Sequence, residues 1–144
     1  MDTTLSVKAT STNGMRATVE AGGFSFIIDE PPAFLGTDTA PSPVLYLLAS
    51  IAGCIQAAAR ISAKDMGLSV GRISVHVSGD TDDDRFFGRK TDVRSGFKSI
   101  SARIEADTNE NETTLNSWLS EIFLRCPVID NILYETSIEL TLNN

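Results

Sequence analysis

The strongest constraint on the fold is the apolar run between Pro43 and Ala59. Ser42 followed by Pro43 favours a helix start, because a serine hydroxyl accepts from free amides and proline fits the first turn. We predict one central helix over 43–66, ending near Gly67. Its first two-thirds is apolar on nearly every side. Such a helix must be enclosed all round, by the chain's own sheets or by a partner subunit.

The rest of the chain has the pattern of a single α+β domain over residues 1–144. Two strong turn signals near the start, Asn13-Gly14 and Gly22-Gly23, separate strand-like runs and predict an antiparallel meander. The predicted order is a β-meander over 1–30, a loop over 31–42, the central helix over 43–66, a β-hairpin over 68–107, helices over 111–133 and a C-terminal strand over 136–142.

The periodicity also predicts which side chains face the core and which face solvent. His76 occupies a polar position of an alternating run, so we expect it on the outward face of a strand. The acidic stretch 80–85 is expected to be a solvated loop, because it lacks the glycine and distal glutamate of a calcium loop. Four residues recur at helical spacing and are expected in the core: Leu115, Trp118, Leu119 and Ile122.

Composition and charge exclude several classes of function. Of the 144 residues, 42% are hydrophobic and 22% are charged, which is typical of a soluble globular protein. The net charge of -7 disfavours partners such as nucleic acid or an anionic membrane surface. Ser50, Gly53 and Gln56 interrupt the apolar run, which falls short of the roughly 18–20 residues that span a bilayer. The polar N-terminus predicts no export signal, so we expect a cytoplasmic protein.

Cys54 and Cys126 are the candidate reactive residues. In a reducing compartment a permanent disulfide is not expected, whereas a transient catalytic one is possible. Two cysteines and one histidine, without carboxylates at suitable spacing, do not predict a zinc site. Cys126 precedes Pro127 at a helix start, where free amides lower a thiol pKa from about 8.5, and Arg125 would add to this effect if it turned that way. Cys54 lies about three turns into its helix, and burial alone would leave it an inert core residue.

Several motifs, in this order, resemble the OsmC/Ohr family of osmotically inducible and organic hydroperoxide resistance proteins. Pro41-Ser42-Pro43, the apolar helix and Gly53-Cys54 look like its first cysteine motif. Gly96-Phe97-Lys98-Ser99-Ile100 looks like its strand entry, and Cys126-Pro127-Val128 looks like its second cysteine motif. The resemblance implies an α+β fold in which two chains intertwine into an obligate homodimer, with antiparallel sheets around long central cysteine-bearing helices.

The resemblance also implies thiol peroxidase chemistry. Cys54 would attack an organic hydroperoxide and become a sulfenic acid, and Cys126 would condense with it to a disulfide. An external dithiol reductant, such as a lipoyl protein, would reset the pair. No metal or other cofactor is required. By the same resemblance, Arg16 would hold the thiolate, although an exposed strand arginine is the alternative.

One departure from the family pattern concerns an acid that orients this arginine. Peroxidase members commonly carry a glutamate nine or ten positions before the first cysteine, where this chain has Leu45 and Val44. The chain is therefore similar to a subgroup that lacks the usual helix glutamate. Three nearby acids are candidates to replace it: Asp29, Glu30 and Asp38.

Three functions remain open from the sequence. The first is a two-cysteine peroxidase acting on organic, apolar hydroperoxides. The second is a catalytically weak module that binds or senses a small apolar or thiol-bearing ligand, which the missing glutamate favours. The third is a stable dimer whose cysteines only fill the core.

Overall fold

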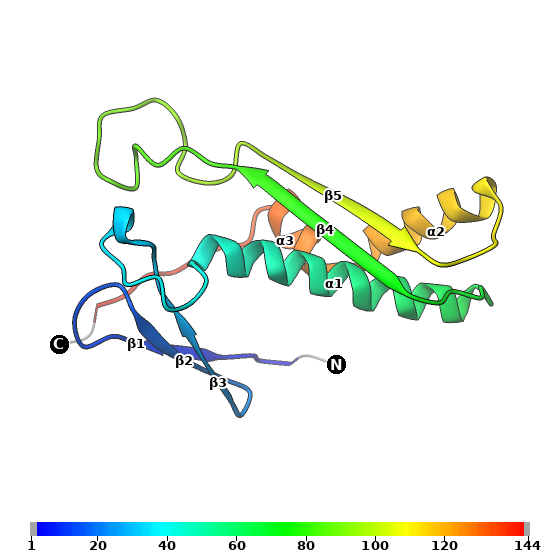
Figure 1. The fold of residues 1–144 in the computed structure, drawn as a ribbon, viewed down its shortest axis with the longest axis horizontal. Helices are drawn as coiled ribbons and strands as arrows, with labels where there is room; N and C mark the ends of the chain where they lie inside the picture. The colour runs from blue at the N-terminus through cyan, green and yellow to red at the C-terminus, as the bar shows by residue number, and fades with distance from the viewer. Residues whose placement is uncertain (1–2, 143–144) are drawn as a thin grey trace. The chain divides into compact units, whose positions relative to one another are not determined.

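The computed structural model describes residues 3–142, which form two compact units that divide after Leu47 (Figure 1). The first unit holds the N-terminal strands and the loop that leads into the long helix. The second holds most of that helix and everything after it. The elements in chain order are β1 (Val7–Thr10), β2 (Ala17–Ala21), β3 (Phe24–Ile28), the short 3-10 helix η1 (Pro32–Phe34), α1 (Pro43–Asp65), β4 (Ile73–Asp80), β5 (Ser99–Ala106), α2 (Glu112–Leu124) and α3 (Pro127–Leu133).

The first unit is an antiparallel meander in the order β1-β2-β3. Gly22 and Gly23 turn β2 into β3 with positive φ angles, a conformation that glycine adopts without steric cost. Val19 pairs with Ala9 on one side and Phe26 on the other, and it is the buried apolar residue of the sheet. The Phe26 ring contacts the Tyr46 ring, and the Tyr46 hydroxyl donates to the carbonyl of Ile27.

Helix α1 begins and ends where its capping residues indicate. The Ser42 hydroxyl accepts from the amide of Leu45 at 3.4 Å, and Gly67 follows the helix with φ +69°. The buried face of α1 consists of Ile51, Ile55, Ala58, Ala59, Ser62 and Ala63. Length and mean hydropathy alone would also permit α1 to cross a membrane, a property that core helices of soluble proteins share.

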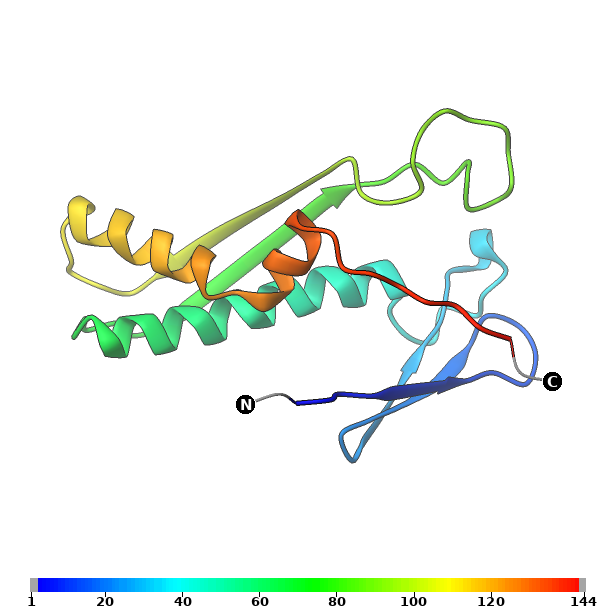
Figure 2. The ribbon, with the colours of Figure 1, turned by 180° about the vertical axis from the view of Figure 1, so that it is seen from behind.

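In the second unit, a hairpin and a helix pair run alongside α1, as the opposite views of Figures 1 and 2 show. β4 and β5 pair antiparallel, with Val75 opposite Ile104 on the inner face. His76 is exposed on the outer face, as its alternating position predicts. Trp118 of α2 is buried, and its indole nitrogen donates to the Ala59 carbonyl of α1 at 3.1 Å.

Within this chain, α1 is not enclosed all round. Val44, Leu45 and Ile61 leave 48%, 54% and 57% of their surface exposed. Leu119 is likewise 53% exposed, so the prediction that it is a core residue is wrong for the single chain. Its helical spacing is right, but it lies at the margin of the buried face that Trp118 occupies. The apolar pattern of this chain therefore exceeds the core that one chain forms.

The predicted C-terminal strand over 136–142 is not formed. Residues 135–142 have no regular secondary structure and pair with no strand among the described residues. Ile138, Leu140 and Leu142 alternate as in a strand, yet all three are almost fully exposed. A strand needs a free edge to pair with as well as an alternating pattern, and only the pattern is visible in the sequence.

Candidate active site

The two cysteines meet in the second unit. Cys54 is half-buried on α1, and Cys126 is the buried residue that caps the N-terminus of α3. Cys54 packs against the buried cluster that contains Cys126, and its thiol is near enough to help raise the pKa of Cys126. The meeting depends on the corner between α2 and α3, where Arg125 ends one helix and Pro127 begins the next. From the sequence, this contact could be predicted only through the family resemblance. Cys54 and Cys126 are far apart along the chain, and their sequence separation does not give their distance in space.

The pKa of the Cys126 thiol is raised, which corrects the prediction that the helix start lowers it. Burial of the sulfur is the largest cause, and the nearby Cys54 thiol acts in the same direction. The amides of Ile129 and Val128 act in the opposite direction, as expected at a helix start, but they are outweighed. Cys126 therefore stays protonated at neutral pH.

Arg125 does not turn toward the cysteines. Its guanidinium binds Glu121, four residues earlier on α2, and Asp65 at the end of α1. These two carboxylates raise the pKa of Arg125. The condition under which Arg125 would help to lower the pKa of Cys126 is therefore not met, because its side chain pairs with these two carboxylates.

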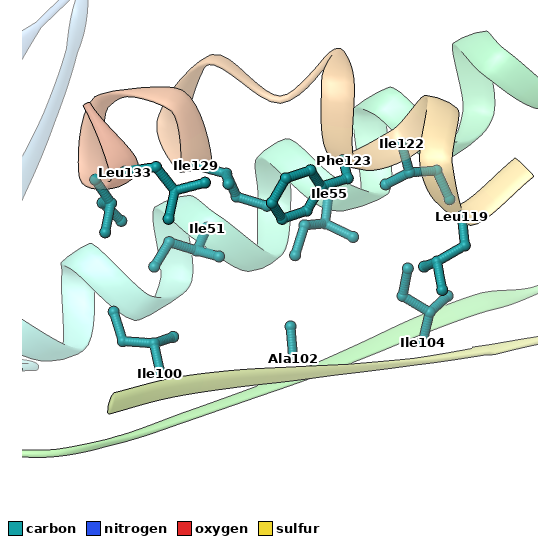
Figure 3. Close-up of a pocket in the computed structure, with 11 residues that line it drawn as sticks. Ile51, Ile55, Ile100, Ala102, Ile104, Leu119, Ile122, Phe123, Ile129 and Leu133 are labelled. Atoms are coloured by element: carbon teal, nitrogen blue, oxygen red, sulfur yellow. The ribbon is translucent and has the colours of Figure 1, made fainter. Parts of the chain in front are cut away.

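An apolar groove of about 290 Å³ lies in the second unit, lined by neighbours of the cysteines along the chain but by neither cysteine itself. In Figure 3, side chains of β5 point across this groove toward α1, α2 and α3. Ile51 and Ile55, which line it, flank Cys54 along α1, and Ile129 follows Cys126 on α3. The complete lining is Ile51, Ile55, Ile100, Ala102, Ile104, Leu119, Ile122, Phe123, Ile129, Ile132 and Leu133.

Most of this groove was missed from the sequence. The alternation of Ile100, Ala102 and Ile104 marks one face of a strand, and that signal was available. It predicts a face that packs on a core. That a hollow remains between this face and residues of α1, α2 and α3 depends on tertiary structure.

Arg16 lies in the first unit, just before β2, and is exposed to solvent. Both cysteines belong to the second unit. The role of Arg16 toward the Cys54 thiolate stays a prediction.

Asp29 is not available as a replacement acid. Its side chain is fully buried and accepts hydrogen bonds from its own loop, including the amide and hydroxyl of Thr39 at 3.0 and 2.9 Å. The hydroxyl of Thr37 and the amide of Glu30 also donate to it. These donors, with the Thr37 hydroxyl first and the Thr39 amide next, hold the pKa of Asp29 well below its usual range. Asp29 is thus a structural residue that fixes the loop before α1.

This arrangement predicts an acid-sensitive loop. A carboxylate with a lowered pKa stabilises the folded state above the ordinary aspartate pKa of about 4, and this contribution is lost as the pH falls below it. Asp29→Asn removes the charge at every pH, so the variant should unfold at lower temperature than the wild type at pH 7. The difference between the two unfolding temperatures should start to shrink below about pH 4 and keep shrinking as the pH falls further. A difference that stays constant from pH 7 down to about pH 2 would contradict this role.

The described residues offer little to a metal ion. No group of three or more His, Cys, Asp or Glu side chains within residues 3–142 is arranged to hold one. Two acids of the 80–85 stretch form ion pairs instead: Asp84 with Arg89 and Asp82 with Lys98.

Taken together, the fold and the site define an α+β protein with antiparallel sheets and a long helix that brings one cysteine against a second at a helix start. The model of the OsmC-like protein family matches residues 36–143, and the chain belongs to this family. The resemblance seen in the motifs and the α+β fold class are thereby confirmed. Among curated proteins, none matches the sequence.

Solved structures share the fold at low sequence identity. An OsmC-like protein from Mycoplasma pneumoniae has a TM-score of 0.79 at 21% identity, covering 92% of this chain and 89% of that one. An organic hydroperoxide resistance protein OsmC from Legionella pneumophila has a TM-score of 0.66 at 19% sequence identity, and the match covers 90% of this chain and 89% of that one. An organic hydroperoxide resistance protein from Elizabethkingia anophelis, with thiocyanate bound, has a TM-score of 0.61 at 15% sequence identity, and the match covers 90% of this chain and 88% of that one.

Proposed function

We propose that this protein is a two-cysteine peroxidase that reduces organic hydroperoxides. The Cys54 thiolate attacks the terminal peroxide oxygen, the O–O bond breaks, and the alkoxide leaves and takes up a proton as the alcohol. Cys126 then attacks the Cys54 sulfenic acid, forming a disulfide and releasing water. An external dithiol, such as a lipoyl group, reduces the disulfide by two exchanges and is itself oxidised to a disulfide.

The contact between the two thiols is the observation that carries this proposal. Condensation of a sulfenic acid with a thiol needs a second sulfur within reach, and the Cys54 thiol is near enough to Cys126 to help raise its pKa. Membership of the OsmC-like family, together with fold neighbours named organic hydroperoxide resistance proteins, supports a peroxide-related redox role. A protonated Cys126 fits the resolving role better than the attacking one, because the thiolate is the nucleophile in the first step.

The apolar groove supports hydroperoxides with a hydrocarbon body as substrates. Every residue that lines it is apolar, and those on α1 flank Cys54. A hydrocarbon group in this groove gains burial, whereas hydrogen peroxide gains nothing from it. In this proposal Arg16 stabilises the thiolate and the departing alkoxide.

We also propose that the chain works as an obligate homodimer in the cytoplasm. The apolar residues left exposed on α1 and along 135–142 are the support for a partner copy, because soluble proteins rarely leave such surface uncovered. Oligomeric state follows directly from sedimentation or light scattering, and a monomer at micromolar concentration would contradict it.

Filling the groove should change substrate preference. Ala102→Phe places a ring in the hollow beside β5, so KM for cumene hydroperoxide should rise about tenfold, the effect of one misfitted apolar group in a pocket. KM for the smaller tert-butyl hydroperoxide should change little. Ser101→Phe is the matched control, because Ser101 lies on the exposed outer face of the same strand. An equal change for both substrates in Ala102→Phe would contradict the assignment of the groove.

A module that binds or senses a small apolar or thiol-bearing ligand is the second candidate. It is favoured by Val44 and Leu45, which leave no acid at the helix positions where peroxidase members carry one, and by the full engagement of Asp29 within its loop. Such a module would bind cumyl alcohol, the alcohol that corresponds to cumene hydroperoxide, as tightly as the hydroperoxide itself. It would not consume the hydroperoxide.

A further inference from the structure

The side chain of Arg125 bridges two parts of the second unit that carry the cysteines. Its Nε and Nη2 each lie 2.8 Å from the Glu121 carboxylate of α2. Its Nη1 binds the carboxylate of Asp65, the last residue of α1. Arg125 therefore ties the end of α2 to the helix that carries Cys54.

This bridge differs from the other ion pairs of the described residues. Those pairs lie within the β4–β5 hairpin, at its base or in its connecting loop: Arg72–Asp107, Arg89–Asp84, Lys98–Asp82 and Arg103–Glu105. Within residues 3–142, only the Arg125–Asp65 pair joins α1 to another element. The corner that holds Cys126 therefore has an ionic contact to α1 in addition to its apolar packing.

The backbone of Arg125 sits at the corner itself. Its amide donates to the Glu121 carbonyl and ends α2, and the next residue, Cys126, begins α3. A change of the backbone angles at Arg125 would therefore swing Cys126 relative to α1. Because the guanidinium is fastened at both ends, such a change would have to break or stretch the contact with Asp65 or Glu121.

We propose that Arg125 is a positioning residue, which holds the α2–α3 corner against α1 so that the Cys126 sulfur stays within reach of the Cys54 sulfur. A role for Arg125 in turnover rests on the proposed peroxidase function. Its effect on the distance between the two sulfurs does not depend on that function. A disulfide requires sulfurs 2.0–2.1 Å apart with defined dihedral angles. A mobile α2–α3 corner would therefore lower the fraction of encounters between the two sulfurs that can form the bond. Arginine suits this task because its planar fork binds two carboxylates at once.

The test is the equilibrium between the dithiol and the disulfide in glutathione buffers. In that reaction, one oxidised glutathione and the two protein thiols give the Cys54–Cys126 bridge and two reduced glutathiones. In Arg125→Gln the equilibrium constant should fall about two- to fivefold, because a partly exposed ionic bridge contributes modestly. Arg125→Lys keeps one charge and should lie between the variant and the wild type. Raising the salt concentration should reduce the wild-type constant toward that of Arg125→Gln.

A matched control separates positioning from general stability. Arg103→Gln breaks an exposed pair on the hairpin and should leave the equilibrium constant unchanged. Asp65→Asn combined with Arg125→Gln should have no more effect than Arg125→Gln alone, because that change already removes the contact with Asp65. Equal constants for wild type and Arg125→Gln, with the bridge formed in both, would overturn the positioning role and leave the proposed function intact. A wild-type protein that forms no bridge at any glutathione ratio would overturn both.

Discussion

Replacing Cys54 by serine should abolish the consumption of cumene hydroperoxide while the protein stays folded. A serine hydroxyl is not ionised at neutral pH and does not attack the peroxide bond, so turnover should fall by at least about three orders of magnitude. The side chain is only half-buried on α1, and sulfur-to-oxygen replacement there changes little packing. The measurement is steady-state peroxide loss with a dithiol reductant, next to an unfolding curve.

Cys126→Ser is the matched control for this prediction, because it removes the other thiol by the same chemical change. This variant should still reduce one equivalent of hydroperoxide per chain, since Cys54 remains. Without a resolving thiol, Cys54 should accumulate as sulfenic acid and then as sulfinic acid, which mass spectrometry detects as added oxygen. Full turnover in Cys54→Ser would remove Cys54 from the role of attacking residue. Loss of the single turnover in Cys126→Ser, with Cys54→Ser still active, would reverse the two roles.

Replacing Trp118 by alanine should destabilise the protein by about 3–5 kcal/mol, the usual cost of deleting a buried aromatic side chain. Trp118 is 4% exposed and packs in the same cluster as Ile51, Ile55 and Cys126. Its indole nitrogen also ties α2 to the Ala59 carbonyl of α1. The free energy of unfolding in urea measures this loss.

Trp118→Phe separates packing from the hydrogen bond. It keeps most of the ring volume and removes the donor, so its cost should be nearer 1 kcal/mol, the net value of one hydrogen bond. Ser120→Ala, on the exposed side of α2, is the control and should change the free energy of unfolding by less than about 0.5 kcal/mol. A Trp118→Ala variant as stable as this control would show that α2 does not depend on its contact with α1.

The long helix illustrates what the sequence can predict. Its start at Pro43 and its end before Gly67 follow from residues at those positions, because capping is a local interaction. The alternation of β4 and β5 likewise predicts the outward position of His76. These predictions need no knowledge of what the rest of the chain does.

Predictions at the site failed where a property depends on distant parts of the chain. The helix start at Cys126 lowers its thiol pKa, as local geometry indicates, but burial raises it further. Burial is a tertiary property that no neighbouring residue reveals. The same holds for Arg125, whose charge is paired by Asp65 from another helix, and for the C-terminal segment, whose strand pattern finds no edge within the described chain.

The most direct test of the central claim is the intact mass of the protein, under non-reducing conditions, after one equivalent of cumene hydroperoxide. The peroxidase proposal predicts a loss of two hydrogens, mapped by peptide analysis to a Cys54–Cys126 bridge within one chain. A folded protein whose mass is unchanged, while the hydroperoxide remains in solution, would contradict the proposal.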